Sequence, residues 1–154
     1  MVIESYNNDT LKSTGTGFVY KKTGGKGYIM TNNHVVDGAN NVKIIYSNGT
    51  TTTADILGKE TYSDIAVLTV KDDTVLSVVS LGDSTKMRLG DTVFTIGSPL
   101  GSEYSGTVTR GILSNKDRLV AVSLTSGSTS DWIMKVLQTD AAINPCLLYT
   151  SPSP

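Results

Sequence analysis

The sequence predicts an all-β fold built from two consecutive β units. Short runs rich in Val, Ile and Thr recur at a spacing of about 10 residues, and turn signals containing Gly or Asn separate them. No amphipathic pattern of about 12 residues interrupts the series, so no long helix is expected. Regularly spaced short strands of this kind are typical of β-sandwiches and β-barrels.

The first β unit is predicted over residues 14–80, and residues 1–13 before it are expected to be a lead-in. The pair Asn48-Gly49 lies between two strand-like runs and is a strong hairpin signal, because a tight primed turn needs positive φ. The strand-like runs of this unit are Thr16–Tyr20, Tyr28–Thr31, Val42–Tyr46, Thr51–Leu57 and Ile65–Val70.

The second β unit is predicted over residues 81–145, after a less regular connection, Lys71–Gly90, that contains the boundary near Val79–Lys86. A polar stretch rich in Gly, Ser and Thr, Ser123–Asp131, is long enough to be a functional loop. The strand-like runs of this unit are Thr92–Gly97, Gly106–Leu113, Leu119–Leu124 and Val136–Thr139.

The last nine residues, 146–154, differ in amino-acid composition from both units. They hold two of the four prolines and the single cysteine, Cys146. Proline cannot donate to a sheet ladder, so this stretch has no place as a central strand. It is expected to be a non-native tail, and a genuine disordered tail is the alternative.

Composition excludes several kinds of partner. The formal net charge is −1 and no run of Lys or Arg occurs, which argues against nucleic acid and anionic membranes. The apolar stretches are far shorter than the roughly 20 residues that cross a bilayer, and no signal-peptide pattern opens the chain. A single cysteine cannot form an internal disulfide. The glycines of Thr14–Phe18 lack the strand–glycine–helix context of a phosphate loop, and neither a cofactor nor a metal is predicted.

Two residues have the chemistry of a catalytic pair. His34, the only histidine, follows a strand-like run, and its near-neutral pKa suits a group that takes and returns a proton. Asp64 begins an apolar strand about 30 residues later, and a buried carboxylate can orient a histidine through Nδ1–H. Taken singly, each has a plainer interpretation: a surface or core histidine, and a turn aspartate.

The chain order of the two residues narrows the class of hydrolase. Histidine before aspartate is the order in chymotrypsin-like proteases, whereas subtilisins and α/β-hydrolases have their triad residues in other orders. Seven segments then agree in order and spacing with one family: Gly15–Val19, Tyr28–Val36, Ser63–Leu68, Leu81–Ser84, Leu89–Gly101, Ser105–Ser114 and Gln138–Pro145. On these segments the chain resembles the HtrA/Deg serine proteases, bacterial quality-control relatives of trypsin.

The resemblance implies a chymotrypsin-like double β-barrel whose second barrel is incomplete here. It implies a serine endopeptidase in which His34 is the general base and Asp64 orients it, with no cofactor or metal. Substrates would be unfolded or misfolded polypeptides, and the parent protein would form trimers outside the cytoplasm, in the bacterial envelope or secreted. Family members usually carry a C-terminal PDZ domain as well.

The chain departs from the family after Asn144-Pro145, where Gly-Asn-Ser-Gly-Gly-Pro would supply the nucleophilic serine and the oxyanion hole. Leu148 stands at the place of that serine. The chain is therefore expected to be a truncated protease domain, inactive as given. Ser151 and Ser153 are flanked by proline, and Cys146 comes two positions too early, so none is a good substitute. The alternatives are a catalytically dead peptide-binding pseudoprotease and an incomplete polypeptide without a function of its own.

Two further features lie near the end of the second unit. Asp140 could be taken for the triad acid, but the resemblance implies a structural role in positioning the following loop. Trp132, Ile133 and Met134 could form an exposed binding patch, and core packing is the favoured interpretation.

Overall fold

The structure is a computed structural model that describes residues 1–98, 105–122 and 132–143. It confirms the all-β prediction: helix in these residues is limited to α1 (Asn33–Val36) and two 3₁₀ turns, η1 (Asp72–Thr74) and η2 (Ser84–Lys86). No helix in the described part of the chain is long and apolar enough to cross a membrane.

The chain divides into two compact units. The first contains Met1–Leu81 and also Ile96–Val108, and the second contains Gly82–Thr95 and Thr109–Ala142. The division after Leu81 lies inside the predicted boundary region. The residues predicted as one second unit, 81–145, are therefore not contiguous, because the ends of two later strands group with the first unit.

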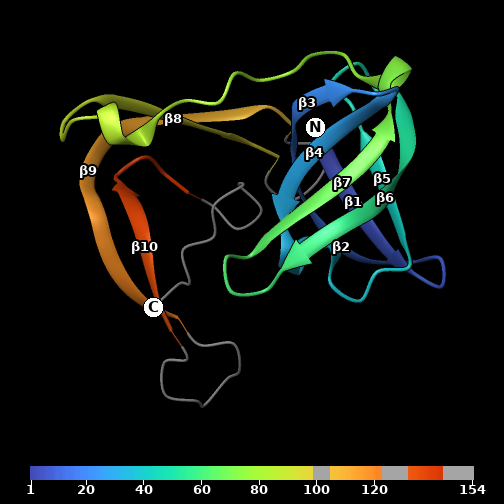
Figure 1. Cartoon of the computed structure of the whole chain (residues 1–154), viewed down its shortest axis with the longest axis horizontal. Coiled ribbons are helices and arrows are strands. Elements are labelled where there is room, and N and C mark those ends of the chain that lie inside the picture. Colours follow the sequence, from blue (N-terminus) through green and yellow to red (C-terminus); the bar gives the residue numbers. More distant parts are fainter. Residues whose placement is uncertain (99–104, 123–131, 144–154) are drawn as a thin grey trace. The chain divides into compact units, whose positions relative to one another are not determined.

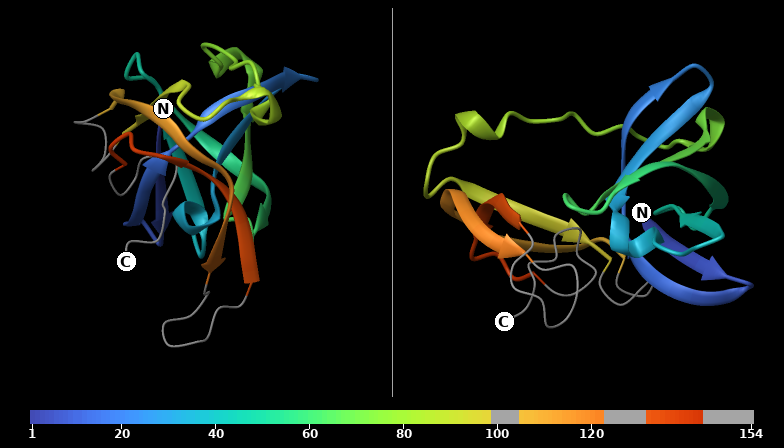
Figure 2. Two further views of the ribbon diagram at one scale, coloured as in Figure 1. Left: turned by 90° about the vertical axis from the view of Figure 1, so that its left-hand side faces the viewer. Right: turned by 60° about the horizontal axis from the view of Figure 1, so that its bottom comes forward.

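The first unit is a seven-stranded antiparallel sheet with the strand order β2-β1-β5-β6-β7-β4-β3 (Figure 1). The outer strands β2 and β3 follow each other along the chain, but no ladder joins them, so the curled sheet does not close into a barrel. Figure 2 shows its curvature from two further directions. The strands are β1 (Val2–Asn7), β2 (Thr10–Thr16), β3 (Phe18–Thr23), β4 (Lys26–Asn32), β5 (Asn41–Ile45), β6 (Thr51–Glu60) and β7 (Ile65–Lys71).

The core of this unit comes from the alternation of buried and exposed side chains along its strands. In β4, for example, Ile29 and Thr31 point inward while their neighbours are only partly buried. The Thr31 hydroxyl donates to the Thr16 carbonyl at 2.9 Å, which connects β4 to β2 across the open side of the sheet. The buried apolar cluster comprises Ile3, Val19, Ile29, Val35, Val36, Val42, Ile44, Tyr46, Ala54, Ala66, Leu68 and Val70.

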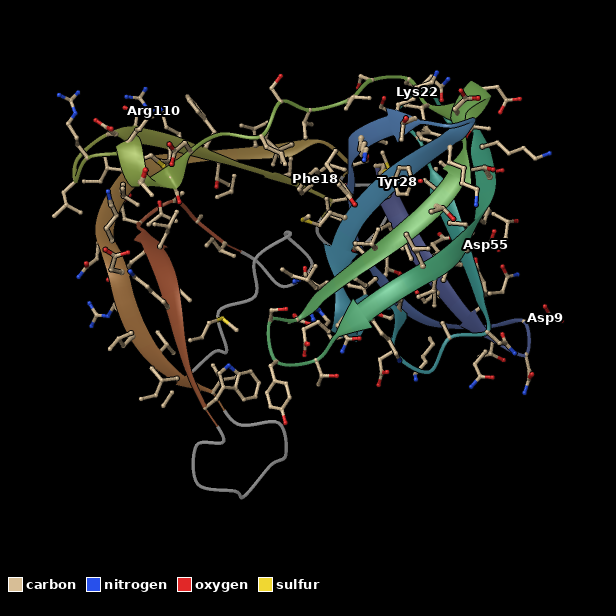
Figure 3. All side chains as sticks on the ribbon, viewed as in Figure 1. Asp9, Phe18, Lys22, Tyr28, Asp55 and Arg110 are labelled. Carbon is tan, nitrogen blue, oxygen red and sulfur yellow. The ribbon has the colours of Figure 1, made fainter. Side chains whose placement is uncertain are left out.

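Residues 1–13 are not a lead-in, because they form β1 and most of β2. Val2 and Ile3 are almost fully buried, and β1 pairs with both β2 and β5. The two strands are joined at Asn8 and Asp9, whose φ values of 48° and 63° are left-handed (Figure 3). Asn and Asp tolerate this conformation, so the turn forms without glycine. The strand pattern is weak in the sequence because Ser5 and Gly15 take buried positions while Leu11 is exposed.

The hairpin predicted at Asn48-Gly49 is confirmed, but its turn type is not the primed one. Only Gly49 has positive φ, at 81°, whereas a type I′ turn needs it at both central residues. The Gly49 N–H donates to the Tyr46 carbonyl at 3.0 Å. The Asn48 Oδ1 accepts from the Thr50 N–H at 3.0 Å and from the Thr50 hydroxyl at 2.7 Å, so side-chain bonds shape the turn.

A three-stranded sheet with the order β10-β9-β8 forms the later part of the fold, from β8 (Thr92–Gly97), β9 (Thr107–Val122) and β10 (Trp132–Thr139). Two strands were expected where β9 runs without interruption. Its polar middle bulges: the pairing with β10 shifts register between Asn115 and Arg118, and Asp117 has a left-handed φ of 62°. Side chains connect the two strands at the bulge, because Arg118 Nη1 donates to Gln138 Oε1 at 2.8 Å and Lys135 pairs with Asp117 at 2.9 Å.

Large apolar side chains of this sheet are exposed. Leu113 is 2% exposed, whereas Phe94 is 62%, Leu119 67% and Ile133 66% exposed. The prediction that Trp132, Ile133 and Met134 pack in a core is therefore wrong for Ile133. The residues 123–131 and 146–154, predicted as a loop and a non-native tail, lie outside the described residues.

Candidate functional site

His34 lies on the single helical turn that directly follows β4. Strand β4 ends at Asn32, the N-cap residue, whose backbone is still extended (φ −81°, ψ 146°). The helical turn α1 begins at the next residue, Asn33. Asn33, Val35 and Val36 are buried beneath the turn. His34 points the other way, with a side chain that is 49% exposed, so a packed scaffold holds an accessible imidazole.

Asp64 lies between the Thr61 turn and the first residue of β7. Its φ of 52° is left-handed, a conformation that aspartate visits more readily than most residues. Strands β4 and β7 are antiparallel partners with Asn32 opposite Ile65. The end of β4 and the beginning of β7 are therefore side by side, and this register brings His34 and Asp64 together.

The two predicted residues form a direct pair. His34 Nδ1 and Asp64 Oδ2 are 2.6 Å apart, and the His34 backbone N–H donates to Asp64 Oδ1 at 2.9 Å. The Asn32 side-chain amide also donates to Asp64, to the carbonyl oxygen at 3.1 Å and to Oδ2 at 3.2 Å. Asn32 was missed from the sequence, since only its proximity to the single histidine hinted at a role.

The pair shifts the pKa of both partners toward their charged forms. The hydrogen bond to Asp64 raises the pKa of His34 above its ordinary value, against the opposing effect of burial. Burial is the largest single influence on Asp64 and would raise its pKa. The bonds from the His34 ring and backbone, the His34 charge and the Asn32 amide together outweigh burial and lower it. An ionised Asp64 that accepts from Nδ1–H leaves Nε2 as the nitrogen that can take up a proton.

Asp140 does not join this pair. It belongs to the second unit, where its Oδ1 accepts from the Ile112 N–H at 2.7 Å. A side chain at Gly111 would collide with Asp140 and Ala141, so glycine permits the close approach. A carboxylate bonded to the backbone in this way supports the expected structural role.

The other predicted site residues lie outside the described residues: Leu148 at the expected place of the serine, and Cys146, Ser151 and Ser153 as substitutes. Within the described ranges, no group of three or more His, Cys, Asp or Glu side chains is arranged to hold a metal ion.

Comparisons with known proteins identify the family of the chain. Residues 15–147 match the model of the family described as "Trypsin-like peptidase domain". Two Bacillus subtilis (strain 168) proteins, "Serine protease Do-like HtrA" and "Serine protease Do-like HtrB", are both 48% identical, over 90% and 84% of this chain. The matches cover only 30% and 28% of those two proteins, so the chain spans less than a third of the length of these relatives.

Solved structures give the same result. Two structures of the HtrA-type protease AlgW with a tripeptide match at TM-scores of 0.75 and 0.74, with 30% and 32% sequence identity. The matches cover 94% and 95% of this chain, and 43% and 44% of those chains. These neighbours support the chymotrypsin-like fold predicted from the sequence. The chain therefore belongs to the trypsin-like peptidase domain family and, within it, is a domain of the HtrA/Deg serine-protease type.

Proposed function

We propose that His34 and Asp64 are the general base and the orienting carboxylate of a serine endopeptidase. The observation that carries this proposal is the 2.6 Å contact between His34 Nδ1 and Asp64 Oδ2, made by the only histidine of the chain. A pair of this geometry fixes the tautomer of the imidazole and stabilises the imidazolium that forms when Nε2 takes up a proton.

In a complete site, His34 Nε2 would remove the proton of a serine hydroxyl as that oxygen attacks a peptide carbonyl. The imidazolium, stabilised by Asp64, would return the proton to the leaving amine. Water activated by the same nitrogen would then hydrolyse the acyl-enzyme. The exposed edge of the imidazole and the raised pKa of His34 support this role as a base.

The chain as it stands would not perform this reaction. Its residues 146–148 are Cys-Leu-Leu, where the family pattern has the Gly-Asn-Ser of the nucleophile loop, so Leu148 replaces the serine. Loss of the nucleophile costs a serine protease about 10⁶-fold in kcat, and the residual rate comes from the oxyanion hole and binding. The glycine of that hole is replaced here as well.

Three further parts of the proposal rest on the HtrA-type resemblance. The substrates are unfolded or misfolded polypeptides that bind as an added β-strand, with no nucleic acid involved. The parent protein forms homo-oligomers, expected to be trimers. It works outside the bacterial cytoplasm, in the envelope or secreted.

A chimera tests the assignment of the base without depending on residues 146–154. In it, residues 15–145 of this chain replace the matching segment of the Bacillus subtilis HtrA protein, which supplies the remaining loops. We expect the chimera to cleave unfolded casein, and His34→Ala or Asp64→Ala to abolish the cleavage. A folded chimera whose activity survives His34→Ala would show that the base lies elsewhere.

The inactivity of the chain itself is tested with a fluorophosphonate probe, which labels activated serines. No labelling above that of a His34→Ala control is expected. Labelling that His34→Ala abolishes would mean that another residue serves as nucleophile. Tight binding of unfolded peptides without hydrolysis would instead favour the pseudoprotease alternative.

A further inference from the structure

The helical turn that carries His34 is capped by a residue from a different part of the chain. Asn32 occupies the N-cap position, where an Asn side chain usually bonds to the first N–H groups of its own helix, but it makes no such bond. Asp64 makes these bonds instead. Its carbonyl oxygen accepts from the Asn33 N–H at 3.0 Å, and its Oδ1 accepts from the His34 N–H at 2.9 Å.

The side-chain amide of Asn32 is directed to Asp64. Its Nδ2 donates to the Asp64 carbonyl oxygen at 3.1 Å and to Oδ2 at 3.2 Å. Oδ2 is the oxygen that meets His34 Nδ1 at 2.6 Å. Every oxygen of Asp64 therefore accepts from the Asn32–His34 segment, and the two elements are connected through backbone and side chain together.

We propose that Asn32 is a positioning residue, whose amide holds Asp64 in the orientation that presents Oδ2 to the His34 ring. Its importance for catalysis rests on the proposed function, but the orientation itself is a property of this chain. Rotating the Asp64 side chain would break its bonds to the Asn32 amide, the His34 backbone and the His34 ring together. Asn32 also secures the backbone of Asp64, whose left-handed φ of 52° is costly for a residue other than glycine.

Few side chains could replace Asn32 in this role. The position needs a donor without charge that reaches two acceptors at once, and a primary amide has two N–H groups on one nitrogen. Aspartate would place a second carboxylate against Asp64. Leucine has a similar volume but no donor. Serine could cap its own helix, as a preferred N-cap residue, but its hydroxyl is shorter and carries one proton.

The single histidine makes the test direct, because every imidazole signal comes from His34. ¹⁵N and ¹H NMR at a pH where the ring is neutral distinguishes the Nδ1–H tautomer from Nε2–H. We expect the unaltered chain to hold the Nδ1–H tautomer with a proton shielded from solvent exchange. Asp64→Asn provides the reference for a ring whose carboxylate partner has been removed.

Asn32→Leu and Asn32→Ser are expected to move the tautomer population at least halfway from that of the unaltered chain to that of Asp64→Asn, and to broaden the Nδ1 proton. Asn32→Ser keeps an N-cap side chain, so it separates positioning from helix stability if Asn32→Leu fails to fold. Asn40→Leu is the matched control. It removes an amide that bonds to Asn8 at 3.0 Å, and the His34 tautomer should not change.

The proposal is overturned if Asn32→Ser retains the amide spectrum of the folded chain and also the Nδ1–H tautomer of the unaltered chain. It is equally overturned if the unaltered chain does not hold the Nδ1–H tautomer. Neither outcome depends on hydrolysis, so a failure here is distinguishable from a failure of the chimera to cleave casein.

Discussion

Asp64 holds His34 at two points: Oδ1 accepts the His34 backbone N–H at 2.9 Å, while Oδ2 lies 2.6 Å from Nδ1 of the same residue. The carboxylate thus fixes both the start of the helical turn and the direction of the ring that the turn carries. Charge, tautomer and local backbone of His34 are coupled through one side chain. Changes in this pair should therefore be visible by titration as well as by unfolding.

The first prediction concerns the pKa of His34. Because the bond to Asp64 stabilises the imidazolium, the ring should titrate above the ordinary value of about 6.5. Asp64→Asn keeps the shape but removes the charge, and the His34 pKa should fall toward that value. The measurement is ¹H NMR of the imidazole ring. Asp55→Asn, an exposed carboxylate on β6, is the control (Figure 3). A titration unaffected by Asp64→Asn would mean that the pair does not form in solution.

The second prediction is a pH dependence of stability. A raised His34 pKa stabilises the fold below about pH 6.5, and the effect is lost as pH rises through the folded-state pKa. A lowered Asp64 pKa stabilises the fold above about pH 3.9, and this effect is lost as pH falls through its folded-state pKa. The advantage of the unaltered chain over His34→Gln should thus be largest between these values. Urea unfolding of both proteins across pH measures it, and an advantage that grows above neutral pH would contradict the linkage.

The third prediction concerns Gly17, which joins β2 to β3. A Cβ there would lie 2.5 Å from Ile3 Cδ1, 3.0 Å from Ile29 Cγ2 and 3.1 Å from the Met30 carbonyl oxygen. Overpacking of this kind usually costs about 1–3 kcal/mol, so Gly17→Ala should lower the urea midpoint. Gly58→Ala is the matched control, because no atom lies within 4 Å of the added Cβ. Equal urea midpoints for the two variants would show that the connection between β2 and β3 has room for a side chain at residue 17.

The fourth prediction is a stabilising change at Ser5. Its side chain is fully buried on β1, and its hydroxyl oxygen has no hydrogen-bond partner among the described residues. A buried unpaired polar group costs about 1–3 kcal/mol, so Ser5→Ala should raise the free energy of unfolding by up to about that amount. Ser47→Ala, at an exposed turn, should have no effect. Destabilisation by Ser5→Ala would indicate that the hydroxyl has a partner in solution.

The fifth prediction concerns the exposed apolar side chains of the three-stranded sheet. Phe94 and Ile133 are 62% and 66% exposed, and large apolar side chains exposed to solvent can promote association. The chain should bind the dye ANS and self-associate in sedimentation experiments. Phe94→Lys combined with Ile133→Lys should reduce both. Leu11→Lys, an exposed apolar residue on β2 of the other sheet, is the control. Unchanged association in the double variant would show that other residues cause the self-association.

Local sequence patterns predicted most of the strands but missed β1 and most of β2. Strands such as β4 and β7 contain runs of apolar and β-branched residues, and the Asn48-Gly49 hairpin has strong turn residues, so both were predictable. Strands β1 and β2 were missed because small or polar residues take buried positions in them while Leu11 is exposed, and because their turn, Asn8-Asp9, lacks glycine. The two predicted halves of β9 are one strand with a bulge at its polar middle, where side-chain bonds connect it to β10.

The sequence by itself determined the all-β class and the choice of His34 and Asp64 as a pair, because residue order and local pattern carry that information along the chain. Only the tertiary structure decided how the pair is held. The antiparallel register of β4 and β7, the left-handed Asp64 and the Asn32 amide connect residues about 30 positions apart. Such contacts depend on which strands become neighbours, and that choice is set by burial of a shared core across the whole sheet.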